Sequence, residues 1–368
     1  MSLQNKENNG VYYFLGSIPS HGLHALPLYS KIGGTFVVTS QKALDTISAY
    51  GVKAIMLEDR PDINLNFGYN IPKTIRFLNK HAKVVLFYEI YGFPIGMRLT
   101  KPKTLFLTHG NILKQYLSPK RITALKQYDY MVGLGPYNHH KFQIEYSIPA
   151  SKLLPLGIAR TDDVVANRGK ITGADSLIDL LSLVPNQPII TYMPTYWGAS
   201  SVHNVGKEIL RNIPDSYNLI FRPHPQTPER IIYEYLGIID AKPGNVVYAP
   251  EGKFKEATLI RMYEASSAII GDISSVMLEA ILIDKPLLFA YDTGGHRQTE
   301  KDVESIKDVV DYSAHIDIES VRSLPYILEN ALARGVDSSI WETTKDYTFF
   351  HHDGTSVASI AQFIKKLL

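Results

Sequence analysis

The segment Ser267-Ala268-Ile269-Ile270-Gly271-Asp272-Ile273-Ser274-Ser275-Val276-Met277-Leu278-Glu279-Ala280 decides the fold, because its pattern changes from strand to helix. The apolar run that ends at Ile270 predicts a buried parallel strand, and the residues from Val276 onward predict a helix. The acidic and hydroxyl cluster between them is then the turn that opens the helix. Such a turn presents free backbone N–H groups and the positive end of a helix dipole, which suits a phosphate.

Short apolar runs alternate with longer amphipathic segments along the whole chain. Strands are predicted at Val11–Leu15, Thr35–Thr39, Lys53–Leu57, Lys83–Tyr88, Thr104–Leu107, Tyr130–Leu134, Pro188–Met193, Leu219–Arg222, Val246–Tyr248, Ala268–Gly271 and Pro286–Tyr291. Helices are predicted at Gln41–Tyr50, Ile71–His81, Ser201–Ile213, Pro228–Tyr235, Lys255–Ala265, Val276–Ile283, Ile318–Arg334 and Thr355–Leu368. Nearly continuous apolar runs are typical of strands buried on both faces, so the fold class is α/β, with parallel sheets covered by helices.

The chain is long enough for two such units, and we expect Rossmann-like domains at residues 1–165 and 166–368. The apolar density falls between Thr161 and Ser176, which places the join there. Ligands of such sheets bind at the carboxyl ends of the strands, and with two domains the usual site is the cleft.

The composition is that of an ordinary globular protein, with 45% hydrophobic and 20% charged residues. A formal net charge of +2 gives no reason to expect a nucleic-acid partner. One region is locally basic, and it is either a solvated face or a contact with an anionic surface such as a membrane or a polyanionic acceptor. Its members are Lys101, Lys103, Lys114, Lys120, Arg121 and Lys126.

The chain has no cysteine, which excludes disulfides and cysteine-ligated metal. No apolar stretch reaches the roughly 18 residues that span a bilayer. The first ten residues are polar and lack the core of a signal peptide. We therefore expect a cytoplasmic protein, either free or peripheral on the inner face of the membrane.

His109-Gly110 follows the strand predicted at Thr104–Leu107, and a helix is expected to begin just after it. A histidine at the carboxyl end of a strand is well placed for proton transfer, and the glycine allows close approach of the backbone. The alternative is a turn histidine bonded to nearby backbone.

Arg222-Pro223-His224-Pro225 also follows a predicted strand. The two prolines stiffen the turn that carries His224. Arg222 can bind a phosphate oxygen in bidentate fashion. The alternative is a rigid turn with an arginine salt bridge.

The side chains of the opening segment complete the candidate phosphate site. Ser274 and Ser275 can donate hydroxyl hydrogens to a phosphate, although an Asp or Ser helix cap explains the same residues. Asp272 alone is better explained as a cap or a backbone-orienting group. Glu279 can accept hydrogen bonds from a ribose or form a salt bridge.

Tyr192-Met193-Pro194-Thr195-Tyr196-Trp197 ends another predicted strand, and Thr195 can present its hydroxyl to the cleft. Tyr196 and Trp197 either stack on a base or pack, and packing is favoured. The pairs His139-His140 and His351-His352 are poor chelates because adjacent side chains diverge, so no metal site and no cofactor are expected.

Five ordered pieces together resemble the CDP-glycerol glycerophosphotransferase family of teichoic-acid and capsule synthesis. They are His109-Gly110 with Lys114, Gly157-Ile158-Ala159-Arg160-Thr161-Asp162, Tyr192-Met193-Pro194-Thr195, Arg222-Pro223-His224-Pro225 and Asp272-Ile273-Ser274-Ser275. The sequence departs from the family pattern at Thr108, Ala159 and Ile273. The resemblance runs from about Thr104 to the C-terminus.

The resemblance implies a GT-B-like fold of two facing Rossmann-like domains, with the final helix crossing back to the first. It implies that His109 and His224 are essential groups of the cleft beside Gly110, Lys114 and Arg160. The second domain would bind the donor, with Arg222, Ser274, Ser275, Thr195, Asp272 and Glu279 around it.

The expected reaction is transfer of a polyol-phosphate from a CDP-linked donor to an acceptor hydroxyl, with release of CMP. His109 would be the base, and the acceptor would be a polyol-phosphate or a glycan- or lipid-linked chain. Two alternatives stay open: a glycosyltransferase or epimerase that uses another nucleotide-sugar, and a non-catalytic nucleotide-binding subunit of a surface-polymer complex.

Overall fold

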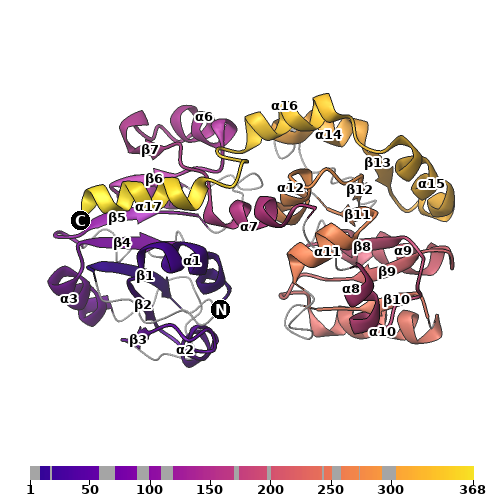
Figure 1. Cartoon of the computed structure of the whole chain (residues 1–368), viewed down its shortest axis with the longest axis horizontal. Helices are drawn as coiled ribbons and strands as arrows, with labels where there is room; N and C mark the ends of the chain where they lie inside the picture. Colours follow the sequence, from indigo (N-terminus) through magenta and orange to yellow (C-terminus); the bar gives the residue numbers. More distant parts are fainter. Residues whose placement is uncertain are drawn as a thin grey trace. The chain divides into compact units, whose positions relative to one another are not determined.

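The computed structural model divides the chain into two compact units (Figure 1). Unit 1 comprises residues 1–163 and 346–368, and unit 2 comprises residues 164–345. The structure describes residues 9–16, 19–57, 71–88, 99–108, 119–169, 174–196, 200–242, 244–250, 258–272, 274–291 and 304–368. The chain passes between the units twice, within α7 (Ala159–Asn167) and within α16 (Ser338–Thr348).

The described strands of unit 1 form a seven-stranded parallel sheet in the order β3-β2-β1-β4-β5-β6-β7. These strands are β1 (Val11–Gly16), β2 (Thr35–Val38), β3 (Ala54–Met56), β4 (Val84–Phe87), β5 (Lys103–Phe106), β6 (Tyr130–Val132) and β7 (Leu153–Leu154). The helices are α1 (Pro19–Ile32), α2 (Gln41–Ser48), α3 (Ile71–His81), α5 (Pro119–Leu125), α6 (Pro136–Ile144) and α17 (Ser356–Leu367), with a 3₁₀ turn at Ala150–Lys152.

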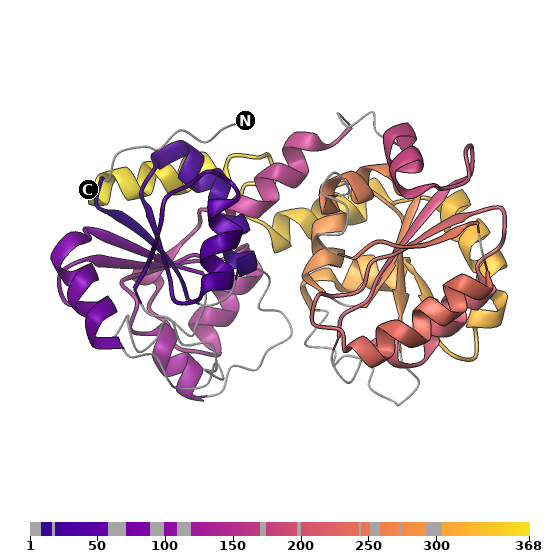
Figure 2. The same cartoon turned by 90° about the horizontal axis from the view of Figure 1, so that it is seen from below.

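Both faces of this sheet are buried, and alternate side chains of each strand enter two separate apolar clusters. Tyr13 and Leu86 pack with residues of α1, α2 and α17 on one face. Tyr12 and Phe87 pack with residues of α3, α5 and α6 on the other face. Figures 1 and 2 show the helices on both sides of the sheet.

The C-terminal segment returns to unit 1, and residues from the family-like motif hold it there. The Asp162 carboxylate accepts hydrogen bonds from the backbone N–H groups of Ser356 (3.0 Å) and Val357 (2.7 Å). It therefore satisfies first-turn donors of α17 and places a negative charge at the positive end of that helix. Gly157 has φ +68°, and a Cβ there would collide with Ser356 and with the Phe350 carbonyl. The GT-B-like return of the final helix is confirmed by this packing.

Unit 2 holds a six-stranded parallel sheet in the order β10-β9-β8-β11-β12-β13 among its described strands. These strands are β8 (Ile189–Met193), β9 (Asn218–Phe221), β10 (Val246–Tyr248), β11 (Ala268–Gly271), β12 (Leu287–Ala290) and β13 (Ala314–Ile316). The helices are α8 (Ala174–Leu181), α9 (Val205–Asn212), α10 (Glu229–Ala241), α11 (Leu259–Ala265), α12 (Ser275–Ile281), α14 (Lys307–Tyr312) and α15 (Leu324–Arg334), with 3₁₀ turns at Ser201–His203, Glu304–Ile306 and Val321–Ser323.

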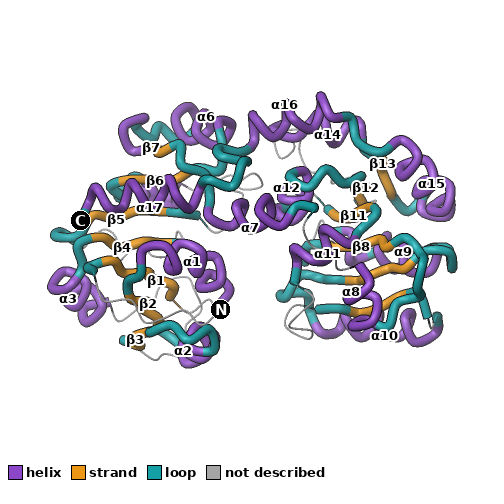
Figure 3. The backbone as a smooth tube through the Cα atoms, in the orientation of Figure 1, coloured by secondary structure: helices purple, strands orange, loops and turns teal. Residues whose placement is uncertain are grey.

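Helices also cover both faces of the second sheet. Ile190, Tyr192 and Ile270 pack with buried residues of α9, α10 and α15 on one face. On the other face α11 lies against β8 and α8, and α12 lies against β11. Figure 3 shows the alternation of strand and helix along the chain that produces these layers.

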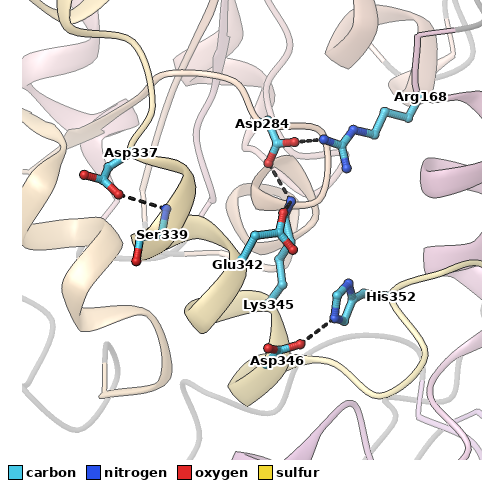
Figure 4. Close-up of polar contacts among 8 residues, drawn as sticks. All are labelled: Arg168, Asp284, Asp337, Ser339, Glu342, Lys345, Asp346 and His352. Carbon is cyan, nitrogen blue, oxygen red and sulfur yellow. Dashed lines mark hydrogen bonds and ion pairs between the residues drawn. The ribbon is translucent and has the colours of Figure 1, made fainter.

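A buried cation in α16 ties this helix to unit 2 (Figure 4). The Lys345 side chain is 2% exposed and pairs with Asp284 (2.6 Å) and with Glu342 (2.7 Å). Asp284 also pairs with Arg168, just beyond α7. Arg168, just after the first passage between the units, and Lys345, just before the second, therefore pair with the same carboxylate of unit 2.

The predicted α/β class with parallel sheets is confirmed. The prediction missed β7 and β13, which are too short to produce an apolar run. The helix predicted at Ile318–Arg334 is observed as α15, which begins six residues later, at Leu324. A 3₁₀ turn precedes Leu324, and Pro325 lies in the first turn of α15. The predicted join at 165/166 lies close to the first unit boundary, while the last 23 residues belong to unit 1. No helix in the described part of the chain has the length and apolar character needed to cross a membrane.

Asp284→Asn tests the clamp on α16. Asparagine tolerates the left-handed backbone at this position (φ 54°) but removes the charge that pairs with buried Lys345. We expect the free energy of unfolding to fall by about 3 kcal/mol, as for other broken buried pairs. Asp311→Asn, which breaks the exposed pair with Lys307, should change it by less than about 1 kcal/mol. Equal losses in denaturant titrations of the two variants would contradict the clamp.

His139 predicts a pH dependence of stability. Burial lowers the pKa of His139 to about 4, although a backbone hydrogen bond raises it, and the ring packs on Phe350 at 4.7 Å. Between about pH 6.5 and 4 the unfolded chain therefore holds a proton that the folded chain does not, so stability falls as the pH falls. His139→Phe should flatten this slope in unfolding titrations. The exposed neighbour His140, replaced by Phe, should leave the slope unchanged.

Candidate functional site

The carboxyl ends of β8 and β11 are adjacent at the point where the strand order of unit 2 reverses. Met193 lies opposite Gly271, and Tyr192 lies opposite Phe221 at the end of β9. The chain goes from β8 outward to β9 and β10, then returns to the other side of β8 as β11. In open α/β sheets this switch point is where ligands bind, because the loops that leave the two strands diverge there.

Asp272 holds the two strand ends together. Its side chain is buried and accepts four hydrogen bonds: from the Thr195 N–H (2.6 Å) and hydroxyl (3.0 Å), the Ser200 hydroxyl (2.8 Å) and the Ser201 N–H (2.9 Å). Four donors match the acceptor capacity of a carboxylate. Asp272 thus acts as a positioning residue for the loop after β8, and its predicted contact with the donor stays a prediction.

Thr195 is part of this network rather than an independent donor. Its hydroxyl hydrogen goes to Asp272, so the remaining capacity of the hydroxyl is that of an acceptor. Its carbonyl lies 2.9 Å from the Ser200 Oγ and is an alternative acceptor for the hydroxyl hydrogen that Ser200 donates to Asp272. The loop is therefore held at Thr195 and at Ser200.

Ser274 and Ser275 begin α12 at the same edge. Ser274 is the N-cap, with its Oγ accepting a hydrogen bond from the Met277 N–H (3.4 Å). Its own O–H remains available as a donor. Both serines are half-buried and lie beside the first-turn N–H groups of the helix. This group of donors fits a phosphate oxygen.

Glu279 is 3% exposed and lies inside the second turn of α12. The Tyr263 hydroxyl lies 2.9 Å from the Val276 carbonyl and 3.4 Å from the Glu279 Oε2, and it can donate its hydrogen to either. The Glu279 side chain therefore supports the packing of α12 on α11, and the predicted ribose contact stays a prediction.

His224 and Arg222 extend the edge from β9. The His224 Nδ1 accepts a hydrogen bond from the Gln226 N–H (3.1 Å), and its ring packs on Tyr196 at 4.4 Å. In a neutral imidazole this bond places the ring proton on Nε2, so His224 presents a donor. The half-buried Arg222 guanidinium donates a long hydrogen bond to the Ala249 carbonyl (3.5 Å). Both side chains follow the strand next to β8, so unit 2 brings the two strand-end motifs together.

Unit 1 contributes a different set of groups. His109, Gly110 and Lys114 lie outside the described residues. Thr108, immediately before them, has φ 48°, a strained conformation for a β-branched residue. The Arg160 Nη1 lies 3.4 Å from His24 Nε2. Together with Tyr88, these residues line a cavity of about 10 Å³, room for about one water molecule.

Sequence reasoning missed the part played by Ser200 and Ser201, whose partner is more than 70 residues away. It also missed that Asp162 caps a helix 194 residues further on. Neither pairing has a local signal, because both depend on how the sheet orders its strands. Among the described residues there is no cluster of three or more acidic or histidine side chains that could hold a metal ion.

Comparison with known proteins identifies the family. The family described as CDP-Glycerol:Poly(glycerophosphate) glycerophosphotransferase matches residues 76–316. The chain belongs to this family.

Two curated relatives have related descriptions. A teichoic acid glycerol-phosphate transferase of Staphylococcus aureus is 23% identical over 242 residues, covering 60% of this chain and 56% of the relative. A teichoic acid glycerol-phosphate primase of Bacillus subtilis is 24% identical over 247 residues, covering 66% and 58%. The chain thus spans less than two thirds of the length of each relative.

Solved structures of the same fold include a teichoic acid polymerase and an epimerase. The wall teichoic acid polymerase TagF superposes with a TM-score of 0.62 at 13% identity, over 100% of this chain and 91% of TagF. The UDP-GlcNAc 2-epimerase of Neisseria meningitidis superposes with a TM-score of 0.66 at 14% identity, over 97% and 100%. At such identities the likeness concerns the fold alone, and it confirms the GT-B-like class of this glycerophosphotransferase family member.

Asp272→Asn tests the network at the switch point. An amide supplies only one acceptor oxygen and points an N–H₂ group at N–H and O–H donors. We expect a loss of about 1 to 3 kcal/mol in the free energy of unfolding. We also expect faster hydrogen exchange at the Thr195 and Ser201 amides. The exposed Asp240 of α10, replaced by Asn, is the matched control and should change neither. Unchanged exchange at both amides would contradict the assigned role.

Proposed function

We propose that this chain transfers a polyol-phosphate, of the glycerol-phosphate class, from a CDP-linked donor to an acceptor hydroxyl in wall-polymer synthesis and releases CMP. Membership of the glycerophosphotransferase family supports the reaction class. The two curated teichoic-acid relatives support the polymer, and TagF was studied after a soak with CDPG.

The observation that carries the proposal is the set of hydrogen-bond donors at the switch point of unit 2. Asp272 fixes the loop from Thr195, and the start of α12 presents Ser274 and Ser275 beside it. Arg222 and His224 stand at the end of the neighbouring strand. This edge of the sheet thus carries several hydrogen-bonding groups: hydroxyls, backbone N–H groups, an imidazole and a guanidinium. Such a set suits the diphosphate of a nucleotide-linked substrate.

The reaction forms one bond and breaks one bond at phosphorus. The acceptor oxygen attacks the phosphorus that carries the polyol, and the bond from that phosphorus to the oxygen of CMP breaks. The acceptor proton goes to a base, for which His109 is proposed, and CMP leaves with the bonding electrons. Such transfers depend mainly on positioning and on stabilisation of charge by fixed donors.

His224 is proposed to stabilise charge at the donor phosphates. The bond from Gln226 to Nδ1 directs the ring proton to Nε2, and the contact with Tyr196 fixes the plane of the ring. A donor held in this way needs no reorganisation as negative charge develops on the leaving CMP.

Unit 1 is proposed to bind the acceptor, with Gly110, Lys114 and Arg160 near the base. A location at the cytoplasmic face of the membrane belongs to the same proposal. Lys103 is one of the basic residues named for contact with an anionic surface. It already pairs with Asp129 (3.0 Å), so its positive charge is partly neutralised and attracts such a surface less strongly.

The test is turnover of the purified chain with CDP-glycerol and a glycerol-phosphate acceptor, measured as release of CMP. His109→Ala and His224→Ala should each lower kcat/KM by about 10² to 10⁴. His140→Ala is the matched control, because His140 is exposed on α6, and it should retain full activity.

A parallel binding panel separates this reaction from the nucleotide-sugar enzymes that share the fold. CDP should shift the melting temperature more than UDP or GDP does. Full turnover in both histidine variants, or an intact donor with every polyol-phosphate acceptor, would contradict the proposal. A stronger response to UDP would favour the nucleotide-sugar alternative.

A further inference from the structure

A groove of about 360 Å³ is lined by residues of strand β13 and helix α15. Figure 1 shows these two elements at one end of the unit 2 sheet. This volume falls within the range of small-molecule sites. Leu324, Leu328 and Ala331 of α15 pack into the core. Residues 326, 330 and 334, spaced four apart, therefore form a stripe along α15 beside its buried face. Together with His315 on β13, this stripe lines the groove.

The polar groups of this stripe have no hydrogen-bond or ion-pair partner in the described part of the chain. Tyr326 is 69% exposed, and Asn330 is exposed beside it. The Arg334 guanidinium lies 4.8 Å from the centre of the Tyr312 ring. Stacking on a ring uses the face of the guanidinium and leaves its in-plane N–H donors available. The groove therefore contains a fixed cation without a counter-ion among the described residues.

His315 adds an acceptor to these donors. Its Nε2 lies 2.9 Å from the Val310 carbonyl, which can only accept, so Nε2 carries the proton. The Nδ1 of the neutral ring is then an acceptor that a hydroxyl group can use. Ile327 and Ala331 supply an apolar floor between the polar groups.

We propose that this groove binds a polyol-phosphate segment of the acceptor or of the growing polymer. Arg334 matches one phosphodiester, His315 and Asn330 match free hydroxyls, and the Tyr326 ring with Ile327 covers the C–H groups of the polyol. The groove is less suited to a nucleoside diphosphate. Arg334 is the last residue of α15, and the negative end of a helix dipole disfavours a more highly charged group.

The groove is separate from the switch point. Helix α15 follows β13 and runs back along it, so Arg334, which stacks on Tyr312 just before β13, lies at the amino edge of the sheet. The switch point lies at the carboxyl edge, so the groove is proposed to hold a part of the polymer away from the reacting end. The inference rests on the proposed function for the identity of its ligand, while binding can be measured without turnover.

The experiment measures binding of a synthetic glycerol-phosphate hexamer to the full chain, without donor, by calorimetry at fixed ionic strength. Arg334→Gln should weaken binding about tenfold or more, as expected for loss of one charge-assisted contact. Asn330→Ala should weaken it by a smaller factor, and it removes no hydrogen bond to a described residue. Arg322→Gln removes an exposed charge outside the groove and should leave the affinity unchanged.

Equal affinity of the wild-type chain and the Arg334→Gln variant would overturn the proposal, as would equal weakening by Arg322→Gln. Binding of an uncharged polyol of the same length with the same affinity would also overturn it. Failure of the proposed function has a different signature, because CDP-glycerol would then stay intact while the hexamer still bound in an Arg334-dependent way.

Discussion

The hydrogen bonds that Asp272 accepts at the switch point are the interaction on which the arrangement of unit 2 most depends. Parallel strands converge at this edge, but the backbone loops that leave β8 and β11 must diverge. A buried carboxylate with four donors fixes both loops at once. These donors saturate the carboxylate. The donors that remain at this edge belong to Ser274 and to the first turn of α12. The interaction of Asp272 thus stabilises the fold and holds the loop after β8 beside the proposed phosphate site.

The sequence predicted the two sheets well, because strands buried on both faces must be almost continuously apolar. Two of the four edge strands, β7 and β13, were missed. They are two and three residues long and gave no apolar run, whereas the short edge strands β3 and β10 were predicted. The returning helix α17 was expected from resemblance alone, since no periodicity tells which unit a terminal helix will join. The apolar residues of α17 pack into the core of unit 1, and Asp162 caps the start of the helix, a role that is visible only once the fold places it there.

In the candidate site, too, the sequence predicted which residues take part but not what each of them contacts. Strand-end motifs are visible in sequence because polar residues follow apolar runs, and Arg222, His224, Thr195 and Ser274 were found in that way. The division of labour among them was not visible. Thr195 donates to Asp272, and Glu279 packs against Tyr263 rather than facing solvent. These roles follow from contacts between residues far apart in the chain, which local patterns do not encode.

Two helix ends in unit 2 carry partial charges of opposite sign. At the switch point the N-terminus of α12 adds partial positive charge to the hydroxyl and N–H donors, which favours the more highly charged group of any substrate. At the groove beside β13 the chain presents the C-terminus of α15, where the charge of Arg334 is partly offset. These charges agree with the proposed assignment of a diphosphate to the first place and of a singly charged phosphodiester to the second. The two places lie at opposite edges of the sheet, because α15 runs back from the carboxyl end of β13 to its amino end. The proposed donor and polymer subsites of unit 2 would therefore not compete for the same hydrogen-bond donors.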